Sequence, residues 1–155
     1  MRITSLFGIL FGSLLLLSPM QSSAGSPRIE IVVIANKAVN LAKISRDELR
    51  PIFQTKKDTW PDGTPARPIN LPDINPVRRA FDSAVLGLEP DRVARYWIDR
   101  KIRGGERPPP TASSSSLVVK LVSKTPGGLG YVEASAVDAS VKVVAKIVDG
   151  QVVAP

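Results

Sequence analysis

The most restrictive feature of the sequence is a short run of β-branched residues. Residues 29–34 read IEIVVI, with almost no polar interruption. A strand that faces solvent on one side alternates apolar and polar side chains, whereas a strand buried on both faces carries a nearly continuous apolar run. The run therefore predicts a strand in the interior of a sheet that is covered on both faces.

The next segment carries a strong signal for a helix start. Ser45 stands three residues before Glu48, the spacing of a capping box in which each side chain binds the other residue's backbone N–H. Pro51 removes a hydrogen bond inside this helix. We therefore expect a kinked or short helix whose last turn brings Ile52 and Phe53 into the core.

Two further helices are expected to begin at prolines. Asn75 is a good N-cap and Pro76 suits the first helical position, and apolar residues at helical spacing continue to Leu88. A third helix is expected from Pro90 to the glycine pair at residues 104–105. Its apolar stripe consists of Val93, Ala94, Trp97, Ile98 and Ile102.

Short extended segments and one more helix complete the chain. The sequence predicts strands at residues 68–71, at the end of residues 125–132 where a glycine-rich turn leads into a strand, and at 141–147, with a weak hairpin over 149–153. The proline- and serine-rich residues 106–116 resemble a linker, but they lead directly into an apolar helical pattern that a serine can cap. This order predicts an α/β fold with a mixed, mostly parallel sheet flanked by helices.

The first residues have the pattern of a secretory signal. One positive charge precedes an apolar run at residues 6–17, and small residues follow at positions 22 and 24. This run is too short to cross a bilayer, which takes about 20 residues. We expect a signal peptide over residues 1–24, a single domain over 25–155, a periplasmic location and no stable membrane insertion; the alternative is an uncleaved anchor.

Composition excludes several classes of function. The 155 residues include no cysteine and no histidine, so disulfides, thiol nucleophiles, imidazole bases and the usual zinc or copper sites are ruled out. We predict a protein that is not an enzyme and that has neither a cofactor nor a metal. The formal net charge of +7 is spread along the chain and suits anionic ligands, but aromatic residues are few and no nucleic-acid motif is present, so nucleic acid is not expected as a partner.

Two expected helix starts are candidate anion sites, because free N–H groups and the helix dipole favour negative charge there. At the first, Asn75 offers an amide, Val77 and Arg78 offer backbone N–H groups, and the side chains of Arg78 or Arg79 can pair with an oxyanion. The second is the serine run, with Ser113, Ser114 and Ser115 as candidates. The alternative interpretation of both segments is purely structural, a capped surface helix that binds nothing.

Several of these segments, in this order, resemble the phosphate-type periplasmic solute-binding proteins of ABC transporters. The segments are IVVIAN, SRDELRPIF, TWPDG, PINLPDINPVRRAF, the YW pair of the third helix, and TPGGLGYV. The resemblance covers most of the chain after residue 24. It implies a single lobe of the periplasmic-binding-protein type, a small oxyanion such as phosphate as ligand, and an ABC transporter permease or another envelope protein as partner.

The sequence departs from that family's pattern in two ways. Full members carry a Ser-Gly-Thr type turn at the helix start, whereas residues 73–76 here read DINP and offer no hydroxyl. The chain is also too short for the second lobe of the full proteins. A second hypothesis therefore stands beside anion capture, namely a ligand-free lobe that serves as a periplasmic protein-interaction or sensory module.

Overall fold

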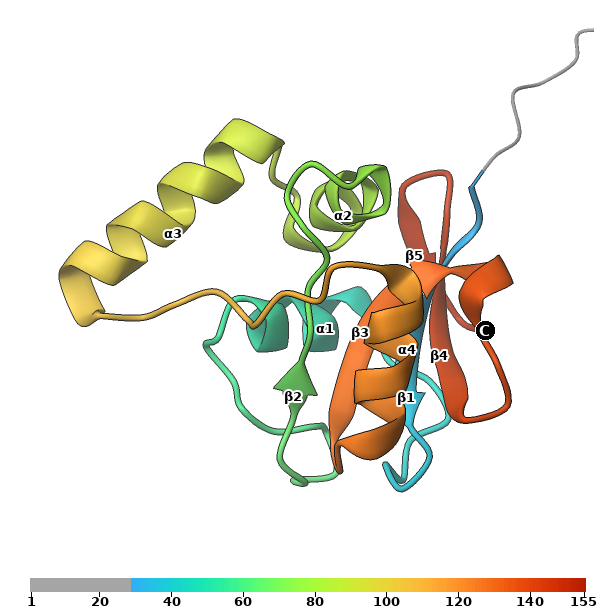
Figure 1. Ribbon diagram of the computed structural model, residues 1–155. Helices are drawn as coiled ribbons and strands as arrows, with labels where there is room; N and C mark the ends of the chain where they lie inside the picture. The colour runs from blue at the N-terminus through green and yellow to red at the C-terminus, as the bar shows by residue number, and fades with distance from the viewer. Residues whose placement is uncertain (1–28) are drawn as a thin grey trace, which may run out of the picture.

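The computed structural model describes residues 29–155; the expected signal peptide lies outside these described residues (Figure 1). The chain forms a curled five-stranded sheet with helices on both faces. In order, the elements are β1 (Ile31–Asn36), α1 (Arg46–Phe53), β2 (Arg67–Pro68), α2 (Pro76–Phe81) with a π-helical turn at Asp82–Leu86, α3 (Pro90–Gly104), α4 (Ser115–Lys124), β3 (Gly128–Glu133), a 3-10 turn at Ala134–Ala136, β4 (Val141–Val148) and β5 (Gln151–Val153).

The prediction of a mostly parallel sheet is wrong. The strand order is β2-β3-β1-β4-β5, and only β2 and β3 run parallel; β1 is antiparallel to both of its neighbours, and β5 is antiparallel to β4. All six residues of β1 are buried, as the sequence predicted. A continuous apolar run reports burial on both faces, and burial does not determine the direction of the neighbouring strands.

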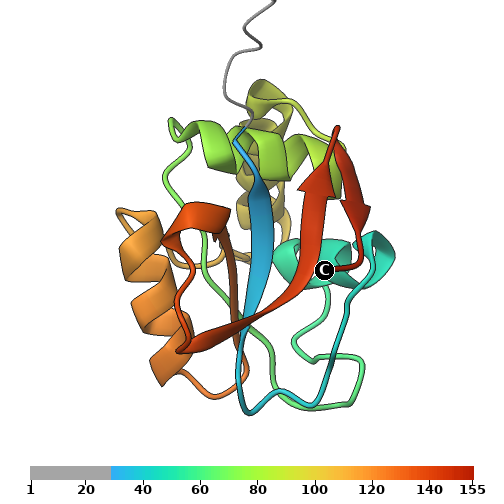
Figure 2. The ribbon, with the colours of Figure 1, turned by 90° about the vertical axis from the view of Figure 1, so that its right-hand side faces the viewer.

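The two faces of the sheet are covered by different helices. Figure 2 shows β1 in the middle of the sheet, with α4 beside one face and α1 beside the other. On β3, a Cβ placed at Gly130 would lie 2.5 Å from Val118 of α4, so a glycine lets this helix approach closely. The next residue, Tyr131, points to the opposite face, where its ring contacts those of Phe53 and Phe81.

The predicted helix boundaries agree with the structure in most places. Ser45 and Glu48 form the expected capping box, and α1 ends two residues after Pro51 with Ile52 and Phe53 buried. The helix capped by Asn75 is shorter than predicted. It changes to a π-helical turn after Phe81 and ends at Gly87, so Leu88 lies outside it.

The turn before β3 depends on a glycine in the left-handed region. Gly127 has φ of +74°, and a Cβ there would lie 1.9 Å from the carbonyl oxygen of Pro65. Its own carbonyl accepts the indole N–H of Trp60 at 2.9 Å. Trp60 is almost fully buried and packs in the core.

The segment that resembles a linker is part of the same unit. The N–H of Asn70 donates to the carbonyl of Pro110 at 2.8 Å, and the N–H of Ala112 donates back to Asn70 at 2.8 Å. These bonds tie the segment to the end of β2.

The sheet edges are short: β2 has two residues, one of them Pro68, and β5 has three.

Helix α3 is the exception to this compact packing. In Figure 1 it projects from the body of the molecule, and it makes only sparse contacts with the described helices and strands. Val93 is its only buried residue, although the sequence gives it a longer apolar stripe. Within residues 29–155, no helix, α3 included, has the length and apolarity needed to cross a membrane.

Candidate functional site

The expected anion site lies where the end of β2 leads into α2. The side-chain oxygen of Asn75 accepts the N–H of Val77 at 2.9 Å. Pro76 has no N–H, and the N–H of Arg79 donates to the carbonyl oxygen of Asn75 at 3.1 Å. Within this described first turn, the N–H of Arg78 is therefore the one left for a further acceptor.

The side chain of Arg78 is buried and points inward. Its Nε lies 2.6 Å from Oδ2 of Asp82, one turn further along, and its Nη1 donates to the carbonyl oxygen of Leu71 at 2.9 Å. Arg78 and Asp82 are only 5% and 6% exposed. The pair fixes the guanidinium beneath the turn that joins β2 to α2.

The buried carboxylate of Asp82 experiences two opposing influences. Burial raises its pKa above the usual range of an aspartate, and the charge of Arg78 and the hydrogen bond to it offset part of that rise. The 2.6 Å contact with Asp82 means that the guanidinium of Arg78 already has a carboxylate partner within the protein.

The floor below the helix start combines a polar bond with ring stacking. The hydroxyl of Tyr131 donates to Oδ1 of Asn70 at 3.1 Å and accepts the N–H of Leu71 at 3.3 Å. Its ring stacks on that of Phe81 with a centroid distance of 3.7 Å. Burial raises the pKa of Tyr131, so the hydroxyl keeps its proton and stays a donor.

A small cavity of about 170 Å³ lies between α2, α3 and the segment at residues 108–111. Its polar lining residues are Asp73, Arg78, Arg79, Asp82, Trp97 and Thr111. Arg79 is exposed and donates through Nε to the carbonyl oxygen of Asp73 at 3.3 Å. The cavity therefore brings two arginines and two aspartates together.

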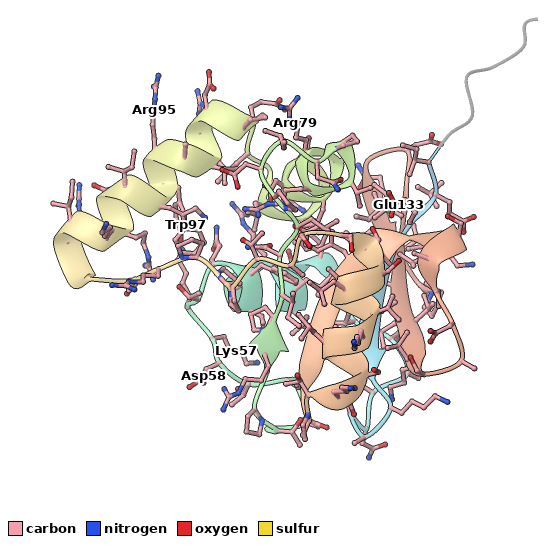
Figure 3. The ribbon with its side chains drawn as sticks, viewed as in Figure 1. Lys57, Asp58, Arg79, Arg95, Trp97 and Glu133 are labelled. Atoms are coloured by element: carbon pink, nitrogen blue, oxygen red, sulfur yellow. The ribbon has the colours of Figure 1, made fainter. Side chains whose placement is uncertain are left out.

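Trp97 of α3 also lines this cavity. Its indole Nε1 is buried and has no hydrogen-bond partner among residues 29–155. A buried N–H without a partner costs about 1–3 kcal/mol, so such groups are usually bonded to water or a ligand. Figure 3 shows Trp97 on the side of α3 that faces the body.

The serine run is not part of this cavity. Ser114 caps α4 by accepting the N–H of Leu117 at 3.2 Å, and the hydroxyl of Ser115 donates to the carboxylate of Glu133 (Figure 3). Ser113 is exposed, and none of the three serines lines the cavity. The structure thus brings Arg78 and Arg79 together and leaves the serines at a separate helix start.

A larger hollow of about 590 Å³ runs along the free side of β2. Ile52, Ile69 and Leu121 line it together with the prolines at residues 108–110. Lys57 and Asp58 also line it, at the place labelled in Figure 3. Its largely apolar lining is less suited to a small oxyanion than the arginine-lined cavity. No cluster of potential metal ligands exists among the described residues.

Sequence reasoning found the arginines but missed their neighbours. Asp82 stands four residues after Arg78, a helical spacing at which a carboxylate meets a guanidinium, so this pair was readable from the sequence. Trp97 and Thr111 come from distant segments that only the tertiary fold brings to α2. No local pattern could have assigned them to this cavity.

Comparison with known proteins supports the fold. No protein-family model matches the chain. An ABC-type phosphate transport receptor from Vibrio cholerae superposes with a TM-score of 0.58 at 17% identity, over 74% of this chain and 44% of that one. A phosphate ABC transporter substrate-binding protein from Clostridium perfringens, with phosphate bound, superposes with a TM-score of 0.60 at 21% identity, over 74% of this chain and 43% of that one.

PstS from Borrelia burgdorferi gives a similar result, with a TM-score of 0.56 at 13% identity over 74% of this chain and 46% of that one. The chain thus spans less than half the length of these solved structures. At such low identity the likeness concerns the fold. It confirms the resemblance in architecture to phosphate-type solute-binding proteins.

Proposed function

We propose that this protein is an exported, single-lobe solute-binding protein that captures a small oxyanion such as phosphate, without chemistry, for ABC-type uptake or for sensing. The proposal includes cleavage after residue 24, a periplasmic location, and an ABC transporter permease or another envelope protein as partner. Its main support is the small cavity that Arg78, Arg79 and Trp97 line together; the indole N–H of Trp97 has no partner among residues 29–155.

The size and charge of the cavity favour a small anion. Its volume of about 170 Å³ is below the roughly 300–1,000 Å³ typical of sites for drug-sized ligands. Arg79 makes no ion pair with any residue of the described part of the chain, so its charge is available to a ligand. The backbone N–H of Arg78, at the start of α2, adds a donor in the same region.

The two aspartates set a condition on the ligand. Asp73 and Asp82 line the same cavity, and a fully ionised anion would be repelled by them. An oxyanion that still carries a proton can donate it to a carboxylate oxygen and so turn repulsion into a hydrogen bond. Among the original candidates, Asn75 and Val77 contribute by holding the helix start in place, and Ser113, Ser114 and Ser115 remain secondary candidates.

Thermal unfolding with added phosphate tests the proposal. A ligand that binds only the folded state stabilises it by RT ln(1 + [L]/Kd), which is about 2.7 kcal/mol when the ligand is at 100 times its Kd. We expect phosphate to raise the midpoint progressively with concentration. Sodium chloride at matched ionic strength serves as the baseline, and sulfate tests whether a protonated anion is preferred.

Variants at the cavity make the test specific. Trp97→Phe removes the indole N–H and leaves a smaller aromatic ring in its place, and Arg79→Ala removes the unpaired cation; both are expected to reduce the phosphate response. Arg95→Ala is the matched control, because Arg95 points away from the body in Figure 3. A phosphate response equal to that of chloride at tens of millimolar would contradict anion capture.

The second hypothesis, a ligand-free lobe acting as a periplasmic protein-interaction or sensory module, also has an observation in its favour. Arg78 is neutralised by Asp82 inside the protein, and Asn75 already occupies the N–H of Val77. On this hypothesis, reversing the charge of Arg79 leaves the response to small anions unchanged and disrupts co-purification with an envelope partner.

A further inference from the structure

Helix α3 has an exposed face that combines apolar and basic side chains. Ile98 and Ile102 lie one helical turn apart and are 60% and 79% exposed. Arg95 and Lys101 are each three residues from Ile98, so both are its neighbours on the helix surface. The face therefore consists of two isoleucines flanked by two cations.

The cations of this face are not neutralised within the protein. Asp99 pairs with Arg103 at 2.8 Å, and Glu106 pairs with Arg100. Asp91, at the start of the helix, is the remaining acidic residue of α3. Arg92, Arg95 and Lys101 make no ion pair with any residue in the described part of the chain.

We propose that this face of α3 binds the surface of an anionic phospholipid membrane, with Ile98 and Ile102 entering the headgroup region. Helices that lie in a membrane interface have a basic polar side and a few large apolar side chains on the other. The projection of α3 from the body leaves this face open (Figure 1), and Figure 3 shows Arg95 pointing away from the body. The result is a peripheral contact and not a membrane span.

Size and charge favour lipid over a protein partner. A stable protein interface buries roughly 800 Å² per partner around an apolar centre that is depleted of charge. Here the apolar strip is only two side chains long and lies between cations. Each basic residue near an anionic lipid surface strengthens binding by about fivefold, so a shallow strip flanked by Arg95 and Lys101 gives weak, reversible attachment.

Vesicle binding tests this proposal, which does not depend on anion capture in the cavity. Residues 25–155 contain every described helix and strand and lack the apolar run at 6–17, so they are the form to use. We expect co-sedimentation with vesicles of phosphatidylglycerol and phosphatidylcholine, little binding to phosphatidylcholine alone, and weaker binding as salt rises. Inorganic phosphate at matched ionic strength should not compete.

Charge reversal supplies a matched pair of variants. Arg95→Glu with Lys101→Glu is expected to lower the partition coefficient on anionic vesicles by at least about tenfold. Lys120→Glu with Lys124→Glu makes the same change in net charge on exposed positions of α4 and should have a much smaller effect. Circular dichroism checks that both variants fold. Equal losses in the two variants would mean attraction by overall charge and would overturn the proposal.

Insertion of the isoleucines is tested separately. Because the chain has no cysteine, Ile102→Cys gives a unique site for an environment-sensitive dye, and Leu121→Cys on α4 is the control. We expect a blue shift and quenching by brominated lipid at position 102 only. An unshifted dye at position 102 would show that the isoleucines do not enter the headgroup region and would overturn the proposal. Binding to poly-glutamate but not to anionic vesicles would also overturn it, because the partner would then be an acidic polypeptide.

Discussion

Helices α1, α2 and α4 differ from α3 in how they begin and in what they pack against. Ser45, Asn75 and Ser114 cap the first three with side-chain hydrogen bonds, whereas Glu89 in front of α3 makes none. Each capped helix buries several side chains against the sheet or its neighbours, but α3 buries only Val93.

This difference separates two kinds of information in an amphipathic pattern. The apolar stripe of α3 correctly predicts a helix, because the spacing of apolar residues is a local property. It does not say what covers the stripe, and here Trp97 lines the cavity toward the body while Ile98 and Ile102 remain exposed. A 15-residue helix of this kind is marginal in isolation, so α3 is expected to be the least stable of the four.

The largest contrast is expected from removing one apolar side chain in each region. Phe81→Ala deletes a fully buried ring between Phe53 and Tyr131 and should lower the free energy of unfolding by about 3–5 kcal/mol. Ile102→Ala on α3 should change it by no more than about 0.5 kcal/mol. Urea unfolding measures both. If the two variants lowered the free energy of unfolding by similar amounts, α3 would belong to the core.

A smaller effect is expected at the caps. Asn75→Ala should lower the free energy of unfolding by about 1 kcal/mol, because the N–H of Val77 loses its acceptor. Glu89→Ala should cost almost nothing, and Glu89→Ser should slow amide hydrogen exchange in α3 by adding a cap. If Glu89→Ala costs as much as Asn75→Ala in urea unfolding, the distinction between capped and uncapped helices fails.

The smallest effect concerns pH at the capping box of α1. The hydroxyl and the backbone N–H of Ser45 lower the pKa of Glu48. A lowered folded-state pKa gives stability that is present above the unfolded pKa and is lost as pH falls through the folded pKa. Glu48→Gln keeps a capping partner but cannot titrate. The difference in free energy of unfolding between this variant and the natural chain should therefore change with pH only in this acidic window.

The control for this measurement is the same variant at neutral pH, where both forms keep the capping box. Chemical denaturation from pH 6 to pH 2 follows the difference in the free energy of unfolding. A difference that stays constant over the whole range would contradict the role of the ionised Glu48. The effect is small because solvent screens this partly exposed group.

The sequence predicted the local features of the fold and missed a non-local one. The Ser45 capping box, the Asn75 cap and the helix stop at Gly105 depend on residues a few positions apart, and all three are present. The direction of β3 beside β1 depends on how segments about 100 residues apart pair. Burial of β1 carries no information on that direction, so the prediction of a mostly parallel sheet failed.

The candidate site shows the same division. Arg78 and Arg79 were recognisable because they follow a predicted helix start, and the structure places both at one cavity. The burial of Arg78 on Asp82, the donor on Trp97 and the contribution of Thr111 arise from packing between separate segments. The serines at the start of α4 were the weaker candidates from the sequence, and the fold keeps them outside this cavity.

The short outer strands have a consequence for the behaviour of the protein at high concentration. A long, flat sheet border offers a ladder of backbone groups on which a strand of another molecule can assemble. Here β2 offers two residues, one of them a proline, and β5 offers three. Edge strands this short present few free backbone groups, so we expect them to add little to association through strand pairing.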